Sequence, residues 1–313
     1  MIPSKFNGKK FSNAKATAEH GWKEVWKWFY QGKRPQWPSW VNNDIAAKPL
    51  QRVHAKEELQ ITYINHATVL IQTASMNILT DPVYAKRVGP YPWLGIKRRR
   101  APGVAFDDLP TIDWVLISHD HYDHLDIQTL KKLYQRDKPG IITGLKVEKH
   151  LPFTEIISLD WWQSHILSPE LKVTFTPSQH FSGRWLNDRN QSLWGSFVIE
   201  APGGPIYFAG DTGLGPHFSE INQHFGPMRA SLIPIGAFLP LWFMGPVHLS
   251  PEDALEAHQI LQSKWSLAIH FEVFPLADDA FGQPRSQLQA ALGKCQNPQL
   301  FEIPEPGQRY TLA

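Results

Sequence analysis

Short apolar runs that end in a histidine or an aspartate recur along most of the chain. From residue 59, LQITYINHATVLIQTASMNILTDPVY alternates β-branched and apolar residues with turn residues, which is typical of short β-strands. Four later runs end on a potential metal ligand: DWVLISH at His119, KVTFTPSQH at His180, PIYFAGD at Asp211 and SLAIH at His270. Because reacting groups gather at the carboxyl ends of strands in α/β sheets, this pattern predicts one site at one edge of an α/β fold.

The densest group of ligand-type side chains lies in LISHDHYDHLD, directly behind an apolar run. His119 and His121 are two apart at the end of an extended segment, so both can point to the same side and bind one cation. Asp123 and His124 follow in a tight turn, from which they can reach a second cation. We expect Asp126 to cap a helix through IQTLKKLYQ.

Composition restricts the kind of metal site. With 42% hydrophobic and 19% charged residues, the 313-residue chain has ordinary globular usage and should fold throughout. Its single cysteine, Cys295, excludes an internal disulfide and a cysteine-rich zinc site, so a metal must be held by histidine and carboxylate.

Two cations about 3.5 to 4 Å apart can clamp the attacking and departing oxygens of a displacement. Seven candidates suffice for two such ions: His119, His121, Asp123, His124, His180, Asp211 and His270.

The first 48 residues differ from the rest in charge and tryptophan content. They hold nine Lys/Arg against three acids, which gives +6, so the remainder of this +2 chain carries −4. In GWKEVWKWFY, Trp22, Val25, Trp26 and Phe29 fall on one face of a helix, with lysines on another. Such a helix either lies in a membrane interface beside anionic headgroups or packs on the main domain, and we favour packing as the usual fate of amphipathic helices.

A domain boundary near residue 58 follows from the change to short strands. We predict a basic, tryptophan-rich extension over residues 1–58 and one main domain over residues 59–313. The N-terminus has no apolar core of signal-peptide length, and no run approaches the roughly 18 to 20 apolar residues needed to span a bilayer. We therefore expect a cytoplasmic protein, attached at most peripherally to the inner membrane face.

Most other histidines carry no special spacing. A lone histidine is more often structural or solvent-facing than a ligand, so we expect such roles for seven of them: His20, His54, His150, His165, His217, His224 and His258. His248, in GPVHLSPEDAL, precedes a predicted helix with Ser250 as N-cap, Pro251 at N1 and Asp253 completing a capping-box-like pattern.

HxHxDH is the signature of the metallo-β-lactamase superfamily. Together with HATVLIQ…ILTDPVY, TPSQH, LWGSF, FAGDTG, IPIGA and AIHF, the chain from about residue 60 to 310 resembles one branch, the N-acyl-phosphatidylethanolamine-hydrolysing phospholipase D family and its bacterial relatives. The resemblance implies a four-layer αββα sandwich, here with a short N-terminal helical extension, and a catalytic domain over residues 59–313 with a binuclear zinc site at one edge.

The same resemblance implies which residue does what. His119, His121 and His180 would hold one zinc, and Asp123, His124 and His270 the other, with Asp211 and a hydroxide bridging them. Asp211, His248 and Asp123 are the expected catalytic residues. His248 matches a family active-site histidine, with a phosphate-binding or proton-transfer role set against plain loop structure. Manganese or iron could fill the same ligands according to supply.

One position departs from the family pattern. Asn65 stands before His66 where the family has glycine in GHA, and asparagine tolerates the left-handed backbone that such a turn needs. We expect His66 in the turn or behind the ligands.

The expected function is hydrolysis of N-acyl-phosphatidylethanolamine, or a related phospholipid, to phosphatidic acid and an N-acylethanolamine. Two dications would activate water and offset charge on the phosphoryl group. The alternatives are another ester, such as a sugar lactone or a cyclic phosphodiester, or a lipid-binding or metal-sensing module with a vestigial site. A nucleic-acid partner is not expected, because residues 49–313 are net −4.

Two segments could contact a lipid. GAFLPLWFMGP, residues 236–246, is either packed core or an acyl-chain wall, and we favour the wall. The basic residues 97–100, Lys97, Arg98, Arg99 and Arg100, either contact phosphate and an anionic surface or form a solvated loop. The sequence does not indicate an oligomeric state.

Overall fold

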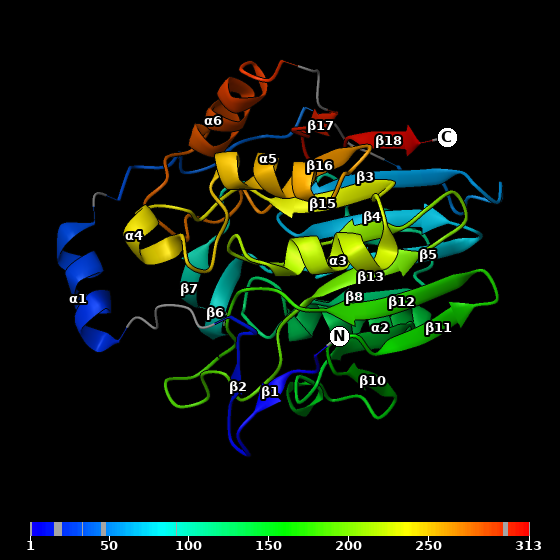
Figure 1. The fold of residues 1–313 in the computed structure, drawn as a ribbon, viewed down its shortest axis with the longest axis horizontal. Helices are drawn as coiled ribbons and strands as arrows, with labels where there is room; N and C mark the ends of the chain where they lie inside the picture. The colour runs from blue at the N-terminus through cyan, green and yellow to red at the C-terminus, as the bar shows by residue number, and fades with distance from the viewer. Residues whose placement is uncertain are drawn as a thin grey trace.

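Two seven-stranded mixed sheets form the centre of the molecule (Figure 1). The computed structural model describes residues 2–15, 21–32, 34–44, 48–91, 93–296 and 300–312, without the side chain of Trp22. In spatial order the first sheet contains β10 (Ile156–Leu159), β9 (Gly140–Gly144), β8 (Trp114–Ile117), β5 (Met76–Thr80), β4 (Thr68–Thr73), β3 (Leu59–Asn65) and β18 (Arg309–Leu312). The second contains β11 (Ser164–Ser168), β12 (Leu171–Thr176), β13 (Ser196–Glu200), β14 (Ile206–Phe208), β15 (Ala230–Pro234), β16 (Ser266–Ile269) and β17 (Phe301–Glu302).

Helices cover the outer face of each sheet. Two short hairpins and the helices complete the described chain: β1 (Lys5–Phe6) with β2 (Phe11–Ser12), β6 (Arg87–Tyr91) with β7 (Leu94–Lys97), α1 (Trp22–Gln31), α2 (Ile127–Asp137), α3 (His217–Phe225), α4 (Leu241–Met244), α5 (Pro251–Ile260), α6 (Gln283–Leu292), and 3₁₀ turns at Phe106–Asp108 and Glu148–His150. Along β8, Leu116 faces the core between the sheets, whereas Val115 and Ile117 face the core under α2. Helices α3, α5 and α6 pack on the second sheet. This is the expected αββα sandwich, which is confirmed.

Strand direction brings the candidate side chains to one edge. β3, β5 and β8 run the same way, because β4 is antiparallel to both β3 and β5 while β5 pairs in parallel with β8. By the same reasoning β12, β14, β15 and β16 share one direction in the second sheet. The segments after these strands therefore leave each sheet at a single edge, as the sequence pattern predicts.

Both predicted helix caps are present. The Asp126 carboxylate accepts hydrogen bonds from the backbone N–H groups of Gln128 and Thr129 at the start of α2. Ser250 and Asp253 form a reciprocal capping box at the start of α5, with Pro251 in its first turn. These caps fix where the loops that carry the candidate site end.

The apolar stripe predicted for α1 does not pack on the domain. Val25, Trp26 and Phe29 are 37%, 56% and 60% exposed. The packed face carries Trp28 instead, whose ring stacks on Phe243 with centroids 5.2 Å apart. The interpretation that we favoured is therefore wrong for these three side chains, because the helix turns a different face to α4.

Two further sequence interpretations are wrong. Asn65 lies in extended strand β3, and the left-handed residue is His66 itself, at φ 47°. Arg98 and Arg100 are buried, so they do not form an anionic-surface contact. Arg98 donates to the side chain of Asn65 and to backbone carbonyls, and Arg100 pairs with Glu272. Buried guanidinium groups need such partners, whereas Lys97 of the same run is exposed.

Within the described ranges, none of the helices has the length and apolar character required to cross a bilayer.

Candidate metal centre

Three imidazoles converge after β8 and β12. His119 and His121 follow β8, which ends at Ile117 and not at His119 as the sequence suggests. His119 Nε2 lies 2.9 Å from His121 Nδ1, and His180 Nε2 lies 3.2 Å from the same atom. A tetrahedral zinc with bonds of about 2.0 to 2.1 Å would place ligand nitrogens about 3.3 Å apart. The three nitrogens match the spacing of a shared cation.

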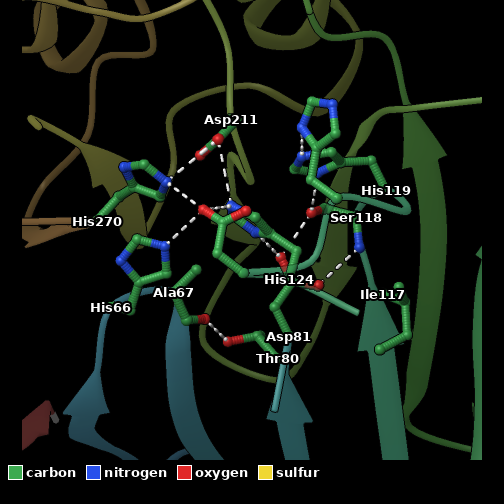
Figure 2. A network of polar contacts seen from close by, with 12 residues as sticks. His66, Ala67, Thr80, Asp81, Ile117, Ser118, His119, His124, Asp211 and His270 are labelled. Atoms are coloured by element: carbon green, nitrogen blue, oxygen red, sulfur yellow. Dashed lines mark hydrogen bonds and ion pairs between the residues drawn. The ribbon is translucent and has the colours of Figure 1, made fainter. Parts of the chain in front are cut away.

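A second group surrounds the carboxylate of Asp211, which follows β14. Asp211 Oδ2 lies 3.2 Å from both His124 Nε2 and His270 Nε2 (Figure 2). It also lies 3.8 Å from His180 Nε2. Asp123 Oδ2 lies 3.3 Å from His270 Nε2 and 3.5 Å from His124 Nε2. Asp211 therefore stands between the two groups of imidazoles.

Asp81 orients ligands of both groups from behind. Its Oδ2 lies 2.7 Å from His124 Nδ1 and accepts the hydroxyl proton of Ser118 at 2.5 Å (Figure 2). Because Ser118 has one hydroxyl proton, its Oγ must accept from His119 Nδ1, 2.9 Å away. Both rings are thus held with Nδ1 protonated and with Nε2 turned toward the centre. His180 Nδ1 donates to the carbonyl of Val247 at 2.9 Å, with the same effect.

The protonation of the site follows from burial and from the two carboxylates. Burial lowers the pKa of His119 and His180 well below the ordinary value, which leaves these rings neutral with lone pairs available. Burial also disfavours a charged His270, but the Asp211 carboxylate and a hydrogen bond to Asp123 raise its pKa to about 9. Although burial opposes ionisation, the charges of His124 and His270 hold the pKa of Asp211 well below its usual range. Without a cation, protons on His124 and His270 compensate the carboxylates.

The donor set fits divalent cations. Among the described residues, Asp211 Oδ1 and His270 Nδ1 are buried without a hydrogen-bond partner. Ligand atoms lie within 4.8 Å of one another in several groups, including His119 with His121 and His180, and Asp123 with His124, His270 and His66. Convergent lone pairs and buried carboxylates in one place are costly unless a cation compensates them.

His66 and His248 both lie next to this centre, His66 beside the Asp123 carboxylate and His248 beside the Asp211 carboxylate. His66 occupies the turn after β3, as expected, and its Nε2 lies 3.0 Å from Asp123 Oδ2. His248 Nδ1 lies 3.9 Å from Asp211 Oδ2, and its side chain is 12% exposed. Burial lowers the pKa of His248 to about 4, so this ring is neutral near pH 7. His248 is therefore placed beside the carboxylate and within reach of a group that enters from outside.

Sequence reasoning missed two residues that support the ligands. Asp81 follows β5 at the same sheet edge, so the strand-end pattern that singled out His119 could have found it. Asn13, from the N-terminal segment, donates from Nδ2 to the carbonyl of His180 at 2.9 Å, and its Oδ1 accepts from the His180 N–H at 3.2 Å and from Trp194 Nε1 at 3.0 Å. No spacing connects residue 13 to residue 180, so only the fold could indicate it.

The other histidines stand apart from the centre. Of the seven given structural or surface roles, His20 lies outside the described residues. His150 contacts Asp120 at 3.2 Å, and His217 contacts Thr212 at 3.1 Å. The remaining four, within the described part of the chain, belong to none of the potential metal-binding groups: His54, His165, His224 and His258.

Comparison with known proteins gives a match over most of the chain. Residues 76–271 match the family model described as beta-lactamase superfamily domain. An uncharacterised protein of Mycobacterium tuberculosis is 37% identical over 261 residues, 80% of this chain and 68% of that protein. The N-acyl-phosphatidylethanolamine-hydrolyzing phospholipase D 1 of Caenorhabditis elegans is 32% identical over 251 residues, 75% of this chain and 70% of that protein.

Solved structures share the fold at lower identity. An isothiocyanate hydrolase from Delia radicum gut bacteria aligns with a TM-score of 0.63 at 23% identity, over 81% of this chain and 98% of that one. A metallo hydrolase from Ignicoccus hospitalis aligns with a TM-score of 0.61 at 20% identity, over 82% of this chain and 99% of that one. At these identities the likeness concerns the fold alone.

Proposed function

Because this chain belongs to the metallo-β-lactamase superfamily of metal-dependent hydrolases, and within it to the N-acyl-phosphatidylethanolamine-hydrolysing phospholipase D-like family, we propose that it is a binuclear zinc phosphodiesterase. Its substrate is N-acyl-phosphatidylethanolamine or a closely related phospholipid, and its products are phosphatidic acid and an N-acylethanolamine. The single observation that carries the proposal is the position of Asp211, whose Oδ2 lies 3.2 Å from both His124 and His270 and 3.8 Å from His180.

The ligand assignment follows from the two groups of side chains. His119, His121 and His180 would hold one cation, Asp123, His124 and His270 would hold the other, and Asp211 would be shared between them. When bound, the two cations activate a water and offset the charge of the phosphoryl group. Asp81 and Ser118 keep the ligand rings in the tautomers that binding requires.

His248 is assigned a role in catalysis and not in metal binding. Its position 3.9 Å from Asp211 Oδ2 supports contact with the phosphoryl oxygens or with the departing alcohol. The capping box of α5 begins two residues later and holds the backbone that carries the ring. In this assignment the neutral His248 ring donates a hydrogen bond to a phosphoryl oxygen, or relays a proton from water to the departing oxygen.

Part of the loop before His248 supports an acyl-chain contact. Leu241 and Trp242 of α4 are 53% and 42% exposed, whereas Phe238 is buried in the domain and is unsuited to an acyl-chain wall. Trp26 and Phe29 of α1 are also exposed, and Lys27 Nζ lies 4.7 Å from the ring centroid of Trp242. An exposed aromatic face beside lysines favours peripheral contact with an anionic membrane.

Product analysis tests the proposed function. The purified, zinc-loaded protein is incubated with N-acyl-phosphatidylethanolamine in detergent micelles, and the products are identified by mass spectrometry. Phosphatidic acid with N-acylethanolamine is the expected result. Absence of these products, with hydrolysis of a generic phosphodiester or a lactone retained, would keep the metal chemistry and reject the substrate.

Replacing His248 with alanine is expected to lower turnover about a hundredfold while both metals are retained, because the ring assists the substrate and does not hold a cation. Turnover and metal content by mass spectrometry are compared with those of His224→Ala, which removes an exposed imidazole on α3. Loss of a metal from His248→Ala would move His248 into the ligand set, and unchanged turnover would return it to a structural role.

Replacing Asn13 with alanine is expected to weaken metal binding about tenfold, because the backbone of His180 loses both hydrogen bonds that hold it in place. The measurement is the chelator concentration that removes half of the bound metal. Asn7→Ala is the matched control, since Asn7 caps only the β1–β2 turn through the N–H groups of Lys9 and Lys10. Equal metal retention in both variants would contradict the role of Asn13.

A further inference from the structure

Five exposed apolar side chains lie on two separate loops, both of which contact the HxHxDH segment. Tyr91, Trp93 and Leu94, at the tip of the β6–β7 hairpin, are 47%, 73% and 48% exposed. Trp185 and Leu186, in the loop over residues 183–190, are 53% and 87% exposed. The Tyr91 ring stacks on Trp93 with centroids 5.3 Å apart and contacts Trp185 edge-on at 6.2 Å. We call these five side chains the aromatic rim.

Hydrogen bonds attach the loop that carries Trp185 to the HxHxDH segment. Asp188 Oδ1 accepts hydrogen bonds from the N–H groups of Arg184 and Trp185, at 3.0 and 2.8 Å. Asp120, inside the HxHxDH motif, accepts the N–H of Gly183 at 2.7 Å, and its carbonyl accepts from Arg184 Nη1 at 2.8 Å. The rim is thus held directly by the segment that carries His119 and His121.

The hairpin is held by the same segment. Val88 and Ile96 of the hairpin pack with Tyr122 of the motif and with Val273 and Phe274, just after His270. The Tyr122 hydroxyl also donates to the carbonyl of Arg184 at 2.7 Å, which connects the hairpin side to the loop. Both halves of the rim therefore have fixed positions relative to the metal centre.

The positive charge around the aromatic rim favours a negatively charged partner. Residues 82–106, which include the hairpin, contain six Lys/Arg and no acid. Lys86 and Lys97 at the base of the hairpin are exposed, whereas Arg98 and Arg100 are buried. Tryptophan and tyrosine prefer the boundary between headgroups and acyl chains, and lysines attract anionic lipid. This combination fits a negatively charged bilayer.

We propose that the aromatic rim inserts into the headgroup layer of an anionic bilayer and thereby holds the HxHxDH segment of the metal centre close to the lipid surface. The inference rests on the proposed phospholipid substrate and adds a contact surface distinct from α1. A lipid that reaches the centre from this side would leave the bilayer only in part, because the rim and the centre are attached to the same segment.

Vesicle binding tests the rim without reference to catalysis. Zinc-loaded protein is sedimented with vesicles of phosphatidylcholine and phosphatidylglycerol that contain no N-acyl-phosphatidylethanolamine. The double variant Trp93→Ala/Trp185→Ala is expected to bind about tenfold or more weakly than the wild type. Ile166→Ala is the control and is expected to bind normally, because Ile166 is 68% exposed on the edge strand β11, at the end of the molecule opposite β6 and β7 in Figure 1.

A charge variant checks the same surface independently. Lys86→Glu/Lys97→Glu is expected to weaken binding to vesicles with phosphatidylglycerol and to leave binding to pure phosphatidylcholine unchanged. Circular dichroism and metal content establish that each variant is folded.

Equal vesicle binding by the wild type and the double variant, or no binding by the wild type, would overturn the proposal that the aromatic rim binds the bilayer. Dissociation of a wild-type oligomer by the double substitution, measured by sedimentation velocity, would assign the rim to a second copy of the chain and overturn it as well. Because the vesicles contain no substrate, binding without hydrolysis of micellar lipid would reject the proposed function and keep the rim. Hydrolysis of micellar lipid without vesicle binding would keep the proposed function and reject the membrane contact of the aromatic rim.

Discussion

Asp211→Asn is expected to lower hydrolysis by about a thousandfold or more while the fold is retained. The carboxylate lies within 3.8 Å of His124, His180 and His270, so one substitution removes negative charge from both proposed cation positions. Several kcal/mol of transition-state stabilisation depend on cations held in this way, and each 1.36 kcal/mol corresponds to a factor of ten in rate. Turnover, metal content and circular dichroism are measured together.

The matched control for this variant is Asp107→Asn. It makes the same change of charge at an exposed position in the 3₁₀ turn Phe106–Asp108. Wild-type turnover is expected for Asp107→Asn. Wild-type turnover in Asp211→Asn would reject the position of Asp211 between the cations, and loss of secondary structure would instead assign the effect to folding.

Removal of the metal is expected to abolish hydrolysis and to lower the melting temperature by about 10 °C. A cation present at about a thousand times its Kd stabilises the folded chain by about 4 kcal/mol. The 313-residue chain has an unfolding entropy of about 2.1 cal/mol/K per residue, so each kcal/mol corresponds to about 1.5 °C, and loss of two such cations corresponds to about 12 °C. After chelation, the second group of ligands depends on protons that His124 and His270 share with Asp123 and Asp211.

Adding metals back separates loss of the cation from damage by the chelator. Zinc is expected to restore both the melting temperature and turnover, and parallel additions of manganese and iron compare the other candidate ions. An unchanged melting temperature and full turnover in protein free of bound metal would reject the metal centre. Recovery of the melting temperature without recovery of turnover would show that the metal ligands are intact and that the catalytic side chains are damaged.

The fold class and the side chains that gather at the centre can be predicted from the amino-acid sequence alone. Strands alternate in a period of two and end at polar residues, so runs such as SLAIH predict both the strand β16 and the position of His270 after it. Local hydrogen bonds are equally visible, because Asp126 and Ser250 cap helices through neighbours only a few residues away. Strand ends and helix caps depend on residues that are close together in the chain, so a sequence pattern is enough to predict them.

Contacts between distant segments could not be predicted from the sequence and are known only from the folded chain. Asp81 reaches His124 through the pairing of β5 with β8, and Asn13 reaches His180 across 167 residues. The burial of Arg98 and the exposure of Trp26 could not be predicted either. A charged residue or an apolar helix face does not by itself indicate which part of the protein will pack against it. Burial depends on the summed packing of both sheets and their helices, and for that reason the aromatic rim emerges only once two loops far apart in the chain are folded together.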